Sequence, residues 1–427
     1  MNLICKRSHR LRRAMGSLGL SLVMGLVGCG GGGDTGNTAN ASGNNSAGLS
    51  QAAQLGKLIF SDATLSASGK MACASCHNPE NAHAQSNALS VQLGGANLDL
   101  PGFRAVPSLR YRDLTPAFFF AADGTPTGGF NWDGRAASLA AQAERPFLAA
   151  HEMANTSKAD VVAKIAQTSY AVQFQQTFGA TVLQDTDAAF NRVQFALQRF
   201  ELEDGDFHPY DSKYDQFLAG RQSLTSPELR GLALFDNSAK GNCAACHPSA
   251  RQADGSSPLF TDFSFDSLGV PRNPVIPATA STDYFDMGLC GPDRTDLSGR
   301  TDVCGKFKVP SLRNVATRKV FFHNGAFTSL RDVVNFYVRR DTEPALWYPL
   351  ASDGSVDKFN DLPLAFRKNV NVLEVPYNRR PGMDPALSAS EIEDLLQFLG
   401  TLTDGYKPPL SRVLFTLPLV HLPDYSL

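Results

Sequence analysis

Apolar residues recur at helical spacing in several separate stretches of the chain, and long polar or glycine-rich stretches lie between them. In residues 51–60 the apolar side chains share one helical face: Ala53, Leu55, Leu58 and Ile59. The same spacing predicts further helices at residues 136–143, 158–168, 187–200, 330–337 and 390–402, and another that begins at residue 226. Strand signals are few. The pattern therefore predicts a mostly α protein with long irregular loops.

The same short motif, Cys-x-x-Cys-His, follows two of these predicted helices, at residues 73–77 and 243–247. Two thiols at this spacing can form thioether bonds to a porphyrin, and the adjacent His can bind its iron, which is typical of c-type haem attachment. Zinc binding or a redox dithiol is the alternative, but zinc needs further ligands and neither copy has a second Cys pair nearby. The repeat therefore predicts two covalently bound haem c groups, held by Cys73, Cys76, His77, Cys243, Cys246 and His247.

The length of 427 residues suits two domains. We expect an N-terminal cytochrome c domain at residues 51–223, a C-terminal one at residues 224–408, and a tail at residues 409–427. The formal net charge of -2 does not favour nucleic-acid binding.

The first 28 residues have the pattern of an export signal, with basic residues before a short apolar run. The run ends in Leu-Val-Gly-Cys and resembles a bacterial lipoprotein signal, in which Cys29 is lipidated. An ordinary secretory signal is the alternative, and the run is short for a membrane anchor. Residues 29–50 are rich in Gly, Asn and Ser and predict a flexible tether. We therefore expect a periplasmic protein, anchored through Cys29 to the outer membrane because Gly30 follows it.

Of the eight cysteines, four are assigned to haem, Cys29 to the lipid and Cys5 to the removed signal, which leaves Cys290 and Cys304. In an oxidising compartment they are expected to form a disulfide that closes a short loop, worth up to about 3 kcal/mol. Two free thiols are the alternative.

Other motifs resemble those of the bacterial dihaem cytochrome c peroxidase and MauG superfamily, over residues 51–408. They lie at residues 131–136 (Asn-Trp-Asp-Gly-Arg-Ala), 152–153, 265–273, 307–314, 323–325 and 336–337. The resemblance implies two tandem cytochrome c-like domains, each with one covalent haem. The first haem would be the peroxidatic one and the second would transfer electrons.

The resemblance also implies roles for residues near the first haem. Trp132 would carry electrons between the haems, although its residue type alone favours a core position. Glu152 would move a proton during cleavage of the peroxide, Gln142 would orient the peroxide, and Pro146 would shape the pocket without ligating iron. A lone Glu is more often a solvated charge. His151 is a candidate to tune Glu152.

One His, His83, follows the first haem motif closely. In peroxidases that need reductive activation, a His after this motif blocks the iron. We expect His83 only near the haem edge, and therefore an iron that is open to peroxide in the ferric state.

The second haem is expected to take Tyr337 as a ligand besides His247, as MauG-like members do. Neither Met287 nor Met383 falls where the methionine ligand of the peroxidases is expected. A core tyrosine is the alternative interpretation.

The calcium site of the family lacks its usual ligands in this chain. The matching positions are Ala105, Arg318 and Val320. Calcium binding is therefore left open, and Arg318 is a candidate to replace its charge between the domains.

These features predict a dihaem peroxidase that reduces hydrogen peroxide to water with electrons from a small cytochrome or cupredoxin in the periplasm. A MauG-like oxidase, which modifies side chains of a partner protein by long-range electron transfer, is the first alternative. An electron-transfer cytochrome or a haem sensor is an alternative of another class, but neither needs Glu152 or an open iron.

Overall fold

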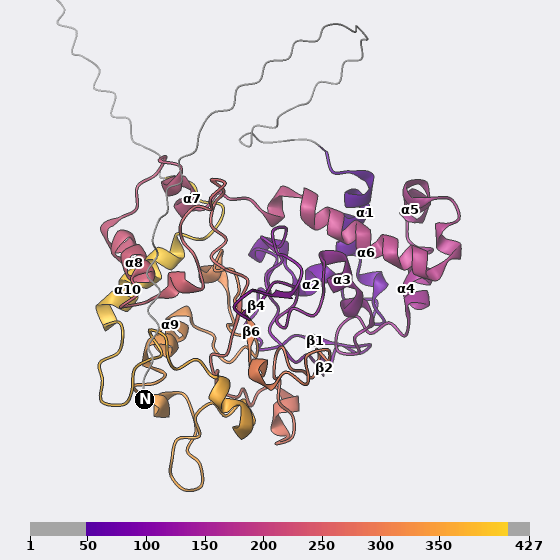
Figure 1. Ribbon diagram of the computed structural model, residues 1–427. Coiled ribbons are helices and arrows are strands. Elements are labelled where there is room, and N and C mark those ends of the chain that lie inside the picture. Colours follow the sequence, from indigo (N-terminus) through magenta and orange to yellow (C-terminus); the bar gives the residue numbers. More distant parts are fainter. Residues whose placement is uncertain (1–47, 409–427) are drawn as a thin grey trace, which may run out of the picture. The chain divides into compact units, whose positions relative to one another are not determined.

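A computed structural model describes residues 48–408 (Figure 1). The predicted signal peptide, the lipidation site Cys29, most of the tether and the tail at residues 409–427 lie outside the described residues. At the end of the predicted tether, Ser50 caps the first helix, because its Oγ accepts a hydrogen bond from the Ala53 amide at 3.2 Å. Among the residues described, no helix is both long enough and apolar enough to cross a membrane.

The described chain is mostly helical, which confirms the predicted class. Its α-helices are α1 (Gln51–Ser61), α2 (Cys73–Cys76), α3 (Leu139–Leu148), α4 (Lys158–Ile165), α5 (Ala171–Phe178), α6 (Thr186–Glu203), α7 (Lys213–Leu218), α8 (Ser226–Asp236), α9 (Leu330–Arg339) and α10 (Ala389–Gly400). Short strands form three antiparallel pairs: β1 (Leu93–Gly94) with β2 (Leu100–Pro101), β3 (Phe119–Phe120) with β4 (Pro126–Thr127), and β5 (Phe265–Asp266) with β6 (Phe307–Lys308).

The sequence pattern located most of these helices, with ends that differ by a few residues, but it misplaced one. The helix predicted at residues 136–143 begins only at Leu139, where the Ser138 side chain caps α3. Ala136 is held in an extended bridge with Phe130, so tertiary pairing overrides the helical pattern there. The pattern also missed the short helices α2 and α7, and it missed α5, which has a single buried residue, Phe174.

A tight helix crossing is built in the same way in each half of the chain. In the first half α1 crosses α6, and a Cβ placed on Gly56 would lie 2.0 Å from the carbonyl oxygen of Ala196. In the second half α8 crosses α10, and a Cβ on Gly231 would lie 2.1 Å from the carbonyl oxygen of Asp394. Each crossing therefore needs glycine, and each positions the helix that leads into a Cys-x-x-Cys-His motif (Figure 1).

Replacing Gly231 with Ala is expected to lower the free energy of unfolding by about 1–3 kcal/mol, because the added methyl group forces α8 away from α10. Denaturant unfolding of the holoprotein measures the loss. The matched control is Gly400→Ala in α10, where an added Cβ meets no atom within 4 Å. Equal stability of the two variants would contradict the tight crossing.

Two hydrophobic cores lie within residues 48–408. One is built from residues between Leu55 and Phe207, and the other from residues between Tyr214 and Leu402. The exact domain boundary at residues 223 and 224 remains a prediction. A third, small cluster contains Leu289 and Val303 and supports the segment in which Cys290 and Cys304 are disulfide-bonded, with their Cα atoms 4.8 Å apart.

Candidate active site

The first pocket contains the first haem motif. Helix α2 presents Cys73 and Cys76, and His77 follows as its C-cap, so all three side chains line this pocket. The Nδ1 atom of His77 lies 3.2 Å from the carbonyl oxygen of His83. Burial lowers the pKa of His77 to about 4, which favours the neutral ring. A neutral imidazole that donates through Nδ1 leaves Nε2 free to bind a metal.

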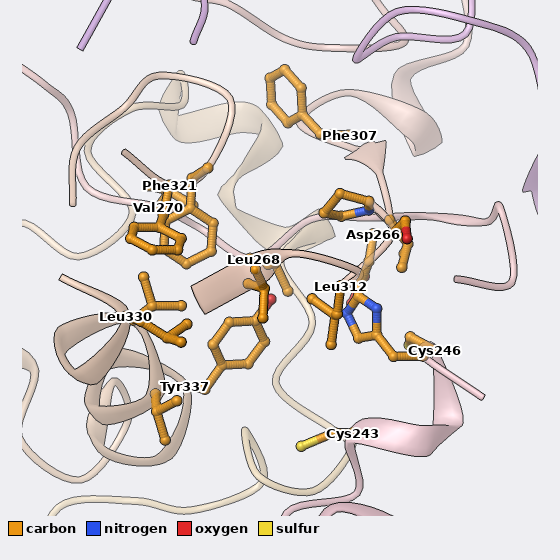
Figure 2. A pocket seen from close by; sticks show the side chains of 18 of the residues that line it. Cys243, Cys246, Asp266, Leu268, Val270, Phe307, Leu312, Phe321, Leu330 and Tyr337 are labelled. Atoms are coloured by element: carbon orange, nitrogen blue, oxygen red, sulfur yellow. The ribbon is translucent and has the colours of Figure 1, made fainter. Parts of the chain in front are cut away.

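The second pocket repeats this arrangement. Cys243, Cys246 and His247 line it, and the Nδ1 atom of His247 lies 2.7 Å from the carbonyl oxygen of Phe260. Burial also lowers the pKa of His247. In Figure 2, Tyr337 reaches into this pocket from α9, and Cys243 and Cys246 lie on another side of it.

The donor set of both pockets fits haem c. The four motif cysteines are free thiols, and each pair shares its pocket with a His whose second ring nitrogen is available.

Buried and half-buried cations along the pockets also fit a haem. Arg112 lines both pockets, and Lys308 and Arg318 line the second. Burial lowers the pKa of each of them, to about 10 for both arginines. Within residues 48–408 none of the three forms an ion pair with Asp or Glu. Because an uncompensated buried cation is costly, these side chains suit the carboxylates that a haem carries.

The residues predicted to act on peroxide come together in the first pocket. Gln142 and Pro146 reach it from α3, and Trp132 and Glu152 line it as well. After α3 the backbone turns sharply, with the Glu152 amide donating to the Ala149 carbonyl oxygen at 2.9 Å. This turn brings Glu152 to the pocket that also contains His77.

The surroundings of Glu152 favour its protonated form. Burial raises the pKa of the Glu152 carboxyl, and Arg145 and Arg135 oppose this rise. The Nε2 atom of His151 lies 3.8 Å from Oε1 of Glu152, too far for a hydrogen bond. The ring of His151 packs edge-on against Phe103 instead.

Trp132 lines both pockets and is held on two sides. Its indole Nε1 donates to the carbonyl oxygen of Ala105 at 2.8 Å. Its own carbonyl oxygen accepts a hydrogen bond from the Lys308 amide at 2.9 Å. One indole from the first half therefore forms part of the wall of both pockets.

His83 does not line the first pocket. Its ring stacks on Phe207 with centroids 4.0 Å apart, and Nε2 lies 2.8 Å from an oxygen of Asp206. Only its backbone carbonyl reaches His77. The ring is therefore held outside the lining of the first pocket.

The second pocket contains two tyrosines and no described methionine. Tyr337 and Tyr377 both line it, with ring centroids 5.9 Å apart, and burial raises the pKa of both. Met287 and Met383 lie outside its lining.

Arg318 joins the two halves at the positions that match the calcium ligands of the family. Its Nη2 donates to the carbonyl oxygen of Val106 at 3.0 Å, and its Nε donates to that of Val320 at 3.3 Å. The carbonyl oxygen of Ala105 is already bonded to Trp132.

Replacing Arg318 with Gln is expected to lower the free energy of unfolding by about 1–3 kcal/mol, because the carbonyl groups that it bridges lose their donor. A chelator should leave the stability of the wild-type holoprotein unchanged. Denaturant unfolding measures both, with the exposed neighbour Lys319→Gln as the control. Bound calcium in elemental analysis, or destabilisation by the chelator, would contradict the replacement.

The sequence patterns missed several residues of the first pocket. Asp293 lies in a distant part of the chain, and Arg112 belongs to none of the sequence motifs. Glu201 is buried in α6, one of its oxygens has no hydrogen-bond partner in the described chain, and burial raises its pKa to about 8. No local signal distinguishes these residues from ordinary surface charges.

Comparison with known proteins gives consistent matches. The family model described as di-haem cytochrome c peroxidase matches residues 50–223. The methylamine utilization protein MauG of Paracoccus denitrificans is 32% identical over 368 residues, which cover 84% of this chain and 90% of that protein. The cytochrome c551 peroxidase of Nitrosomonas europaea is 29% identical over 297 residues, which cover 66% of this chain and 71% of the peroxidase.

A solved structure agrees with these relatives. The crystal structure of the diheme peroxidase BthA from Burkholderia thailandensis superimposes with a TM-score of 0.76 at 39% sequence identity. The match covers 83% of this chain and 86% of BthA.

Proposed function

Because this chain is an oxidoreductase that belongs to the di-haem cytochrome c peroxidase and MauG family, we propose that it reduces hydrogen peroxide to water in the periplasm. The balance is one peroxide, two electrons and two protons for two waters, with the electrons drawn from a small cytochrome or a cupredoxin. The observation that carries the proposal is the grouping of Glu152, Gln142 and Pro146 with His77 in one pocket.

The first haem would be held by Cys73, Cys76 and His77, and the second by Cys243, Cys246 and His247. When bound, the haems supply iron centres that bind peroxide and exchange electrons with it. Calcium is not required by this proposal.

The side chains of the first pocket would handle the protons. Glu152 takes a proton from the near oxygen of peroxide and returns it to the leaving oxygen, so that water departs. The Gln142 amide can hydrogen-bond the peroxide and hold it in line. Pro146 carries no donor or ligand atom in its side chain and limits the space beside it.

Two further side chains would serve electron transfer and the ligation of the second haem. Trp132 offers an oxidisable indole in the wall of both pockets and would pass oxidising equivalents between them. Tyr337 would complete the ligands of the second haem, since the second pocket has tyrosines rather than methionine. An anionic phenolate favours higher iron oxidation states.

We expect the all-ferric holoprotein to react with peroxide without prior reduction, because the His83 ring is engaged with Phe207 and Asp206. Stopped-flow absorbance after mixing ferric protein with peroxide tests this proposal. A fast spectral change at a low peroxide concentration supports it. A strict need for a half-reduced protein would contradict the expectation that the ferric iron is open to peroxide.

Tyr337 favours a second candidate, a MauG-like oxidase that acts on a partner protein. The lifetime of the oxidised state separates the two candidates. Rapid decay with added cytochrome or cupredoxin favours the peroxidase. A long-lived oxidised state that small donors do not discharge favours the oxidase.

A further inference from the structure

A loop from the second half of the chain contributes to the first pocket. Cys290 and Cys304 close this loop, and Asp293 within it lines the same pocket as Glu152. The disulfide lies far along the chain from the first haem motif, so this contact depends on the tertiary fold.

Asp293 contacts the two arginines that face Glu152. One oxygen of Asp293 accepts a hydrogen bond from Nη2 of Arg145 at 2.6 Å, and the other lies 3.5 Å from Nη1 of Arg135. The Asp293 side chain is only 22% exposed. Arg145 lies on α3, directly before Pro146, so the ion pair also ties the loop to the helix that forms the pocket wall.

The loop is fixed to the first half beside this ion pair. Nη1 of Arg294 donates to the carbonyl oxygen of Asp133 at 2.9 Å, and its guanidinium lies 3.8 Å from the ring centre of Phe118. Leu289 and Val303 are buried at the two ends of the loop. Asp293 is therefore held in place by covalent, polar and apolar contacts.

We propose that Asp293 is a positioning residue that holds Arg145 and Arg135 and thereby sets the proton affinity of Glu152, and that the disulfide-closed loop delivers it. The assignment rests on the proposed role of Glu152 in peroxide cleavage. Without Asp293, two guanidinium groups would face Glu152 with less opposing charge and would favour the ionised carboxylate.

The charged and titratable groups around Glu152 support this reasoning. They are His151, Arg145, Arg135, Asp293 and the thiols of Cys73 and Cys76, which become thioethers when haem is attached. Arg135 is already paired with Asp133 at 2.6 Å, whereas Arg145 has Asp293 as its acidic partner within the described chain. After burial and the two arginines, Asp293 is the remaining group that shifts the pKa of Glu152, and it raises it.

The test compares wild-type holoenzyme with Asp293→Asn. Fluoride binding to the ferric protein is measured by absorbance at several pH values. It reports the ionisation of Glu152 without turnover, since an ionised carboxylate disfavours a bound anion. The pH midpoint of this binding should fall by about one unit in the variant, because loss of a neighbouring negative charge lowers the pKa of a carboxyl by roughly that much. The rate constant of the peroxide reaction, plotted against pH, should have its acidic limb shifted to lower pH by the same amount, since Glu152 then ionises at lower pH.

Matched variants separate this role from a structural one. Asp296→Asn changes the same loop at a residue that pairs with Arg294 and is 64% exposed, and it should leave the midpoint unchanged. Asp293→Glu should restore the wild-type midpoint. The double variant Cys290→Ser with Cys304→Ser should shift the midpoint in the direction of Asp293→Asn.

An unchanged midpoint in Asp293→Asn overturns the assignment of Asp293, and an unchanged midpoint in the double Ser variant overturns the role of the disulfide. If wild-type ferric protein binds fluoride with the expected pH dependence but does not react with peroxide, the proposed function fails while Asp293 keeps its role.

Discussion

Replacing Glu152 with Gln is expected to slow the reaction of the ferric holoprotein with hydrogen peroxide by about 10²–10⁴-fold, the usual contribution of a positioned acid–base group. Gln has nearly the same shape as Glu but cannot accept and return a proton. Burial raises the pKa of the Glu152 carboxyl, which favours its taking up a proton from peroxide. Stopped-flow absorbance measures the second-order rate constant.

The control for this experiment is Glu144→Gln on α3. Glu144 pairs with Lys158 at 3.0 Å and does not line the first pocket. Its loss should leave the rate constant unchanged, and haem content should be equal in both variants. A Glu152→Gln variant that reacts as fast as wild type would remove the acid–base role and, with it, the main support for peroxide chemistry.

Replacing Tyr337 with Phe is expected to change the ligation of the second haem outright, because the phenyl ring has no ligand atom. The absorbance and electron paramagnetic resonance spectra of one haem of the two should change, and the first should keep its spectrum. The oxidised state formed with peroxide should also decay faster, since the phenolate that favours high oxidation states is gone.

Tyr377→Phe provides a closely matched control, because Tyr377 lines the same pocket with its ring 5.9 Å from that of Tyr337. This variant should keep the wild-type spectrum. If Tyr377→Phe changes the spectrum and Tyr337→Phe does not, the ligand is assigned to the wrong tyrosine.

The sequence predicted the part of the site that lies on one continuous stretch. Gln142, Pro146 and Glu152 lie at intervals from Trp132 that resemble those of the dihaem peroxidase family, and this resemblance implied their shared pocket. Asp293 could not be predicted in this way, since it meets Arg145 only when a loop from the second half folds over the first.

The fold shows the same division. Helical periodicity located α1 and α10, whose faces are strongly patterned. It misplaced the start of α3, because a bridge between Phe130 and Ala136 holds the preceding residues extended. The need for glycine at Gly56 and Gly231 could not be predicted from local sequence either, because it depends on a helix that is distant in sequence.

The placement of Trp132 and Arg112 limits the independence of the two halves. Both residues precede the predicted second domain in sequence, yet both form part of the wall of its pocket. A separately expressed second half would leave that pocket open to water on this side, and water access is one of the factors that set the reduction potential of a haem. The two halves therefore do not form two autonomous modules, because the pocket proposed for the second haem is complete only in the intact chain.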